Sequence, residues 1–262
     1  MKARSPRRGI RSLRAAVGFG VGMIAAAVTA LSGTAVPTAA AADIGGVEPF
    51  IVGGRNATET YSFMASLQST SGSHSCGGSL IKANWVVTAA HCGQPAQVRV
   101  GTTNRTSGGA VARVAQRIAH PSADLALLRL STSVSQAPVA IAPQSGATGT
   151  ATRIIGWGQT CAPRGGCGAP VALQELDTSI VADNRCSGIS AASEICTNNP
   201  DGNKGACYGD SGGPQVKQVS GAWQLIGATS RAGNNSSTCA TGPSIYVDVS
   251  YYASWIAQNT GG

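Results

Sequence analysis

Residues 51–262 contain many short apolar runs, separated by turns rich in glycine, serine and asparagine. Nine such runs lie at 63–67, 79–81, 85–88, 97–100, 126–130, 152–157, 172–179, 215–219 and 223–228. Runs of this length between turn residues are typical of β-strands rather than helices. Many short strands predict an all-β fold, and the pattern alone does not distinguish a sandwich from barrels.

One stretch near the end of the chain has helical spacing instead. Within residues 251–259, Tyr252, Trp255 and Ile256 fall on one face of a helix. An amphipathic helix of this kind buries its apolar face against the rest of the domain. We therefore expect a short docking helix at about 250–260.

The first 42 residues resemble an export signal. A start with six basic residues precedes an apolar stretch at 15–31 and a small-residue cleavage zone at 38–42. A membrane anchor is the alternative, but glycines dilute the apolar stretch, and it is shorter than the ~20 residues that span a bilayer. We expect general secretion, with no membrane attachment once the signal is removed.

The charge of the chain changes when this leader is set aside. The formal net charge is +8, and the first 50 residues hold six basic and two acidic residues, which leaves 13 basic and nine acidic residues, or +4, for 51–262. A surplus this small and scattered indicates ordinary surface charge, whereas a nucleic-acid footprint is a clustered basic stripe. We expect no nucleic-acid partner.

All eight cysteines lie after residue 50. This placement indicates an oxidising compartment and a set of disulfides, although spacing alone does not fix their pairing. Cys161 and Cys167 are six residues apart in a Gly/Pro loop, for which a local bridge is the simplest assignment. Zinc binding is the competing interpretation, but no histidine lies near them in the sequence.

Two segments carry the chemistry. Residues 207–214 read Cys-Tyr-Gly-Asp-Ser-Gly-Gly-Pro, and His91 ends the run Val-Val-Thr-Ala-Ala. A serine hydroxyl is a weak nucleophile that needs a neighbouring base, and the oxyanion it generates needs hydrogen-bond donors. The glycines around Ser211 allow a tight turn that exposes its hydroxyl.

These segments resemble the chymotrypsin family of serine endopeptidases, whose triad runs in the order histidine, aspartate, serine. The resemblance covers essentially all of 51–262 and implies two packed six-stranded antiparallel β-barrels with the active site between them. The first barrel is expected at about 51–130, a linker at 131–147 and the second barrel at 148–249. We expect a bacterial source.

The resemblance assigns a role to each catalytic residue. Ser211 would be the nucleophile, His91 the base and Asp124 the carboxylate that orients His91, while the N–H groups of Gly209 and Ser211 would form the oxyanion hole. A core histidine at position 91 and a turn cap at position 124 are the alternatives. The other two histidines, His74 and His120, are expected at the surface.

The segment Ile51-Val52-Gly53-Gly54 resembles the family's activation motif. The resemblance implies that cleavage after Phe50 frees an ammonium group at Ile51, which then pairs with the buried carboxylate of Asp210. Residues 43–50 would form a short activation propeptide. The simpler interpretation is that Ile51 only starts a strand.

The resemblance also proposes the remaining disulfide pairs: Cys76 with Cys92, Cys186 with Cys196, and Cys207 with Cys239. By alignment from Ser211, the substrate pocket would have Gly205 at its base, with further contacts from Tyr208, Ser230, Ala232 and Ser244. None of these residues is acidic, so a substrate Arg or Lys would be buried unpaired. An apolar or aromatic substrate side chain is expected, with an elastase-like preference as the alternative.

One position near this pocket departs from the family pattern. Arg231 stands where an aromatic residue usually forms a wall of the cleft, and we expect it to point to solvent or to meet an acidic residue of the substrate. The loop 101–117 contains no acidic residue, so no calcium site is expected there. No metal or other cofactor is expected anywhere.

The favoured function is a secreted serine endopeptidase that acts through an acyl-enzyme. A catalytically inactive binding protein on the same fold is the alternative from another class, and an esterase would use the same chemistry. The expected partners are protein or peptide substrates and protein inhibitors of proteases. We expect a monomer.

Overall fold

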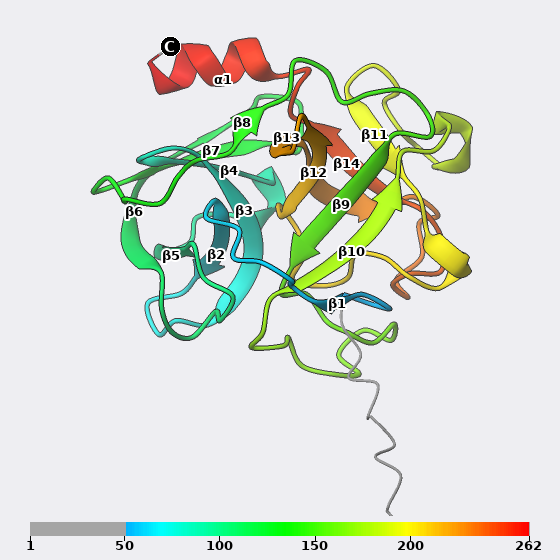
Figure 1. The fold of residues 1–262 in the computed structure, drawn as a ribbon, viewed down its shortest axis with the longest axis horizontal. Coiled ribbons are helices and arrows are strands. Elements are labelled where there is room, and N and C mark those ends of the chain that lie inside the picture. The colour runs from blue at the N-terminus through cyan, green and yellow to red at the C-terminus, as the bar shows by residue number, and fades with distance from the viewer. Residues whose placement is uncertain (1–50, 262) are drawn as a thin grey trace, which may run out of the picture. The chain divides into compact units, whose positions relative to one another are not determined.

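The computed structural model describes residues 51–261, which form two β-structures and one C-terminal helix (Figure 1). The expected signal and propeptide lie outside the described residues. No helix in 51–261 is long and apolar enough to cross a bilayer. The strands are β1 (Arg55–Asn56), β2 (Met64–Gln68), β3 (His74–Lys82), β4 (Trp85–Thr88), β5 (Gln97–Val100), β6 (Ala110–Ala119), β7 (Ala126–Leu130), β8 (Ala140–Ile141), β9 (Ala151–Gly156), β10 (Gln174–Ser179), β11 (Glu194–Thr197), β12 (Pro214–Val219), β13 (Ala222–Ala232) and β14 (Ser244–Asp248).

Six strands form a closed antiparallel barrel in the order β2-β3-β4-β7-β6-β5. Alternate side chains of a strand point to opposite faces, so each strand sends a row of apolar residues into the barrel. Leu67, Leu80, Val98 and Leu128 are fully buried there. This barrel carries the short 3₁₀-helix η1 (Ala90–Cys92), which holds His91.

The other eight strands form one sheet in the order β1-β10-β9-β12-β13-β14-β11, with β8 parallel to β13. The all-β prediction is confirmed, together with one closed six-stranded barrel. The second closed barrel is not seen as such and stays a prediction. Strand β13 is bulged between Thr229 and Arg231, which leaves Ser230 out of the pairing with β14.

Five of the fourteen strands have no counterpart among the expected runs: β1, β6, β8, β11 and β14. Two of them are only two residues long, and in β6 arginine and glutamine interrupt the apolar residues, so it lacks a long apolar run. Its neighbours β5 and β7 supply the pairing. For β1, β6 and β8, cross-strand hydrogen bonds rather than local hydrophobicity make these segments strands. Strands β11 and β14 do contain short buried apolar runs, which the sequence analysis missed.

A buried carboxylate fixes the start of the domain to the second sheet. Glu175 on β10 is fully buried and accepts hydrogen bonds from Arg55, Thr58 and Tyr61. Arg153 on the adjacent strand β9 lies 3.3 Å from the same carboxylate. These bonds and ion pairs hold the pKa of Glu175 below its usual value, although burial alone would raise it.

Helix α1 (Ala253–Thr260) confirms the expected docking helix. Ile256 is buried in the main core, and Tyr252 and Trp255 pack against that core. The ring of His120 lies 4.7 Å from the ring of Tyr252 and 5.0 Å from that of Trp255. His120, expected at the surface, is partly exposed, and its ring packs against these two aromatic rings.

Candidate active site

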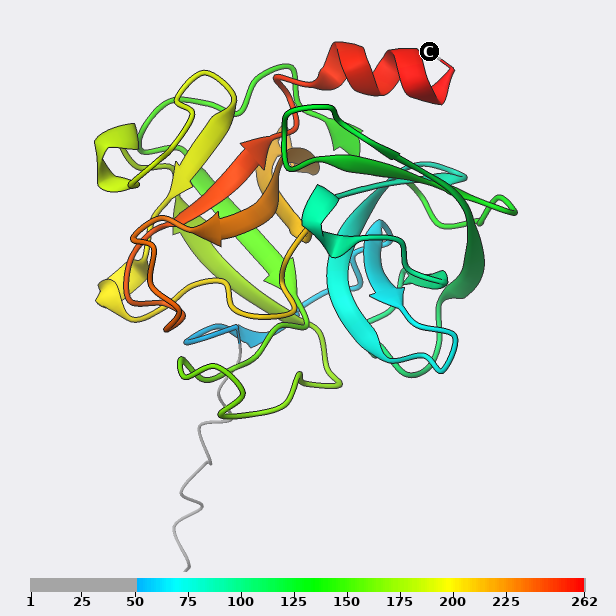
Figure 2. The same cartoon turned by 180° about the vertical axis from the view of Figure 1, so that it is seen from behind.

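His91 and Asp124 form the centre of the site. The Nδ1 atom of His91 lies 2.7 Å from Oδ2 of Asp124, and the backbone N–H of His91 donates to Oδ1 at 2.9 Å. His91 sits on η1, directly after β4, and the disulfide Cys76–Cys92 fastens that turn to β3. In Figure 2 this turn, in teal, lies on the side of the barrel that faces β13 and β14.

A local turn presents Asp124 to His91. The N–H groups of Ser122 and Ala123 donate to Nδ1 of His120, and the N–H of His120 donates to the carbonyl oxygen of Leu125. His120 is held in turn by the rings of α1. The helix at the end of the chain therefore supports the turn that carries Asp124.

Asp124 accepts a third hydrogen bond, from the hydroxyl of Ser230 to Oδ2 at 2.7 Å. Ser230 is the bulged residue of β13, and bulges near active sites commonly redirect a side chain in this way. Burial raises the pKa of the Asp124 carboxyl, but the hydrogen bonds from His91 and Ser230 outweigh burial and hold that pKa below its usual value. Asp124 is therefore ionised at neutral pH.

Ser211 lies in a turn that both halves of the domain fix. Its carbonyl oxygen accepts from Gly77 N–H of the barrel at 2.8 Å, and the next residue, Gly212, donates to Thr229 of β13. Gly212 has φ of +73°, and a Cβ atom there would collide with the hydroxyl of Thr88. Only glycine fits this position.

The backbone donors beside Ser211 are free. Within residues 51–261 no acceptor is recorded for the N–H of Gly209 or of Ser211. Gly209 has φ of +102°, a backbone conformation that L side chains rarely adopt. Two unpaired N–H groups on one tight turn are the arrangement that stabilises an oxyanion.

His74, expected at the surface, is partly exposed and also holds this turn from behind. Its Nε2 atom lies 3.0 Å from the carbonyl oxygen of Gly209, and its Nδ1 atom lies 2.8 Å from the hydroxyl of Ser66. Burial lowers the pKa of His74 to about 4. A neutral imidazole therefore bridges β2 and the Gly209 peptide at physiological pH.

Asp210 is almost fully buried. Its carboxylate accepts from the N–H of Gly158 at 2.8 Å and of Cys207 at 2.9 Å. Within residues 51–261 no cation is recorded beside it, and burial raises its pKa to about 7. The Ile51 side chain is also buried, in a cluster that includes Tyr246, a residue whose hydroxyl lies within electrostatic range of Asp210.

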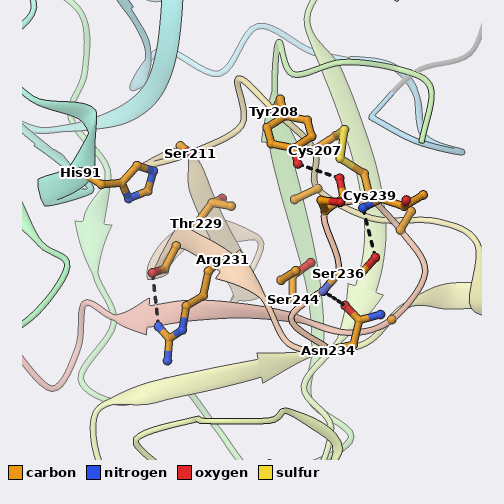
Figure 3. A pocket seen from close by; sticks show the side chains of 17 residues that line it. His91, Cys207, Tyr208, Ser211, Thr229, Arg231, Asn234, Ser236, Cys239 and Ser244 are labelled. Atoms are coloured by element: carbon orange, nitrogen blue, oxygen red, sulfur yellow. Dashed lines mark hydrogen bonds between the residues drawn. A yellow bond between two sulfur atoms is a disulfide. The ribbon is translucent and has the colours of Figure 1, made fainter. Parts of the chain in front are cut away.

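A cavity of about 370 Å³ lies beside His91 and Ser211 (Figure 3). The other expected pocket residues Tyr208, Ser230, Ala232 and Ser244 all line it. Gly205 does not. Its neighbour Ala240 lines the cavity instead.

Much of the remaining lining is small or hydroxylated, including Ala206, Thr229, Gly242 and residues 236–240. Among residues 51–261, no Asp or Glu lines this cavity. Arg231 also lines it, but both of its Nη atoms donate to Glu194, at 2.6 and 2.8 Å. Arg231 is exposed, as expected, and its acidic partner comes from β11 of the protein itself.

The four disulfides join the expected cysteines: Cys76 to Cys92, Cys161 to Cys167, Cys186 to Cys196, and Cys207 to Cys239. Three functional contacts escaped the sequence analysis, namely those of His74, Ser230 and Ala240. The partners of His74, Ser66 and the Gly209 carbonyl oxygen, come from other parts of the chain, and no local sequence pattern identifies them. The bulge that turns Ser230 toward Asp124 depends on pairing between distant strands.

Comparison with known proteins agrees with this geometry. The trypsin family model matches residues 51–256. Trypsin alpha of Drosophila erecta is 37% identical over 89% of this chain and 95% of its own length, and trypsin of Sus scrofa is 35% identical over 79% and 94%. Fibrinolytic enzyme isozyme C of Lumbricus rubellus is 32% identical over 80% and 100%. These relatives are animal proteins and lend no support to the expected bacterial source. The chain belongs to the trypsin family of chymotrypsin-like proteases, and it is a serine endopeptidase.

Proposed function

We propose that Ser211, His91 and Asp124 are the catalytic triad of a secreted endopeptidase. The observation that carries this assignment is that His91, which is hydrogen-bonded to Asp124, lines the same cavity as Ser211. His91 Nε2 takes the proton from Ser211 Oγ as that oxygen attacks the substrate carbonyl carbon. The N–H groups of Gly209 and Ser211 stabilise the resulting oxyanion.

Breakdown of the tetrahedral intermediate completes acylation. His91 returns the proton to the leaving amine, and the acyl group stays on Ser211 Oγ. Water, deprotonated by His91, then releases the acid. Asp124, ionised at neutral pH, keeps the His91 proton on Nδ1 and stabilises the imidazolium that forms in each step.

Labelling with a sulfonyl fluoride tests the nucleophile directly. The reagent should modify Ser211 alone, and peptide mapping by mass spectrometry should find the adduct on residues 207–214. The Ser211→Ala protein is the matched control and should stay unlabelled. An adduct at another serine, or a fully active labelled protein, would contradict the assignment.

We further propose that the cavity accepts an uncharged side chain before the scissile bond, such as Phe, Leu, Met or Tyr. The support is the lining, in which no carboxylate is available to neutralise a substrate cation. Ala232 and Ser244 are larger than glycine and make the cavity shallower, so an elastase-like preference for small side chains is the second candidate. Measuring kcat/KM for peptides that differ only in Phe, Leu, Ala, Glu or Lys before the scissile bond would identify the preferred side chain. Fastest cleavage after Lys or Glu would overturn the assignment.

Activation by cleavage after Phe50 is also proposed. Its support is the buried Asp210 carboxylate, which has no cation among the described residues, and the buried Ile51 side chain in the cluster that contains Tyr246. The new ammonium group would give the carboxylate a partner and fix the adjoining Gly209 turn. A precursor that retains 43–50 should be much less active than the trimmed chain.

We infer that the second sheet closes into the second barrel of the family. The end of β10 meets β11 through the bridge Ile180–Thr197, and Val181 N–H donates to Cys196 at 2.8 Å. Strand β11 is one end of the strand order, and β10 is next to β1 at the other end, so this bridge lies across the opening. The export of the chain, which rests on its first 42 residues, and its monomeric state are proposals as well.

A further inference from the structure

A short loop closed by the disulfide Cys161–Cys167 lies against the wall of the cavity. The N–H of Cys239, which lines the cavity, donates to the carbonyl oxygen of Ala162 at 3.0 Å. The buried side chain of Gln159 donates to Pro163 O at 3.1 Å and accepts from Gly165 N–H at 3.0 Å. The loop is thus braced at several points and holds a defined position.

This loop presents Arg164 at the rim of the cavity. The guanidinium carbon lies 5.0 Å from the ring centroid of Tyr208, within range of a cation–π contact. Tyr208 lines the cavity and is itself fixed, because its hydroxyl donates to Ser237 O at 2.6 Å. Across residues 51–261 no carboxylate is recorded as a partner of Arg164.

A second arginine at the cavity provides a contrast. Arg231 forms two hydrogen bonds to Glu194 and a third to Gly188 O at 2.8 Å. Its charge is therefore balanced within the protein. Arg164 is exposed and keeps a free positive charge beside the cavity.

Figure 3 shows Tyr208 and Arg231 on different sides of the cavity, and Arg164 contacts Tyr208. The last residue of β13 that pairs with β12 is Ala228, so the edge at Ser230–Ala232 is open for an added substrate strand. Substrate residues before the scissile bond would occupy that edge. Tyr208 directly precedes the Gly209 donor on the opposite wall, where the residues after the scissile bond would leave.

We propose that Arg164 is a specificity-determining residue that selects an acidic side chain within the first three residues after the scissile bond. The inference rests on the proposed function, since it assumes that the scissile carbonyl lies at Ser211 and Gly209. Ion pairs at an exposed site are weak, so the expected preference is about fivefold in kcat/KM. It should shrink as the salt concentration rises.

Matched peptides test this directly. Each pair would share one uncharged sequence and differ only by Asp or Asn at the first, second or third position after the bond. The wild-type enzyme should cleave the Asp peptide about fivefold faster at one of these positions. Arg164→Gln should bring that Asp/Asn ratio to near one, and Arg164→Glu should reverse it and favour a Lys peptide.

Arg231→Gln is the control variant, because it removes the arginine whose charge is already balanced; the Asp/Asn ratio should stay at the wild-type value. A ratio that survives Arg164→Gln, or that responds only to Arg231→Gln, would overturn the proposal. Failure of the proposed function has a different signature, in which no peptide is cleaved and Ser211 takes up no sulfonyl label.

Discussion

The closed barrel and the second sheet contribute different chemistry to one site. The barrel supplies the proton-handling pair, His91 and Asp124, whose hydrogen bonds are partly exposed to solvent. The second sheet and its loops supply Ser211 and the buried carboxylate of Asp210. Proton transfer requires that His91 reach the cleft, whereas the turn that carries the oxyanion donors requires burial to keep its shape.

Removal of the nucleophile should have the largest effect and should isolate the contribution of the second sheet. Ser211→Ala should lower kcat by roughly a millionfold, as deletion of a triad nucleophile does elsewhere. Within 51–261 no hydrogen bond of the Ser211 hydroxyl is recorded, so the melting temperature should stay close to that of the wild type.

The barrel's contribution is tested by combining variants. His91→Ala should be as damaging as Ser211→Ala, and the double variant should lose little more, because the two residues act as a unit. Residual kcat within tenfold of the wild type in either single variant would refute the shared site.

Asp124→Asn tests the orientation of His91. We expect a fall in kcat of roughly ten-thousandfold, because the amide favours the wrong imidazole tautomer. Ser230→Ala leaves the carboxylate in place and removes one donor, so its effect should be far smaller, about tenfold. Steady-state kinetics of the two variants would give this ranking, and equal losses would contradict it.

The buried Asp210 carboxylate predicts a difference in stability between the precursor and the trimmed chain. In the precursor its pKa is raised to about 7 from an unfolded value near 3.8. The folded state then binds more protons, so the contribution of Asp210 to stability falls as pH rises from about 4 to 7. After trimming, pairing with the Ile51 ammonium should remove this fall.

Denaturant unfolding from pH 4 to 8 would measure this contrast. Both forms should carry Ser211→Ala so that neither digests itself, and Asp210→Asn in the precursor is the control that should flatten the curve. Parallel curves for precursor and trimmed chain would rule out the pair at Ile51.

His74 links the two regions and should give the smallest effect. Burial lowers its pKa to about 4 in the folded protein, below the ordinary value of 6.5. The unfolded chain then binds more protons between these values, so stability should decline as pH falls from about 6.5 to 4. His74→Gln should lose this decline, which unfolding measurements at pH 4.5 and 7 would detect; an unchanged slope would argue against the buried neutral histidine.

Much of this arrangement follows from local sequence. The run before His91 and the glycines around Ser211 locate both segments, since each needs a particular short-range geometry. The strand β6 and the inward position of His74 were not predictable in this way. Each depends on partners that are distant in the chain.

The residues alone were enough to predict the all-β class, the chemistry of the nucleophile segment and the absence of an acid among the expected pocket residues. Three features needed the folded chain: Ala240 rather than Gly205 lines the cavity, Glu194 neutralises Arg231, and Arg164 contacts Tyr208 with no carboxylate partner among residues 51–261. Residue types and spacings encode local turns and reactive groups. Charge balance and cavity shape depend instead on which distant segments the sheets bring together.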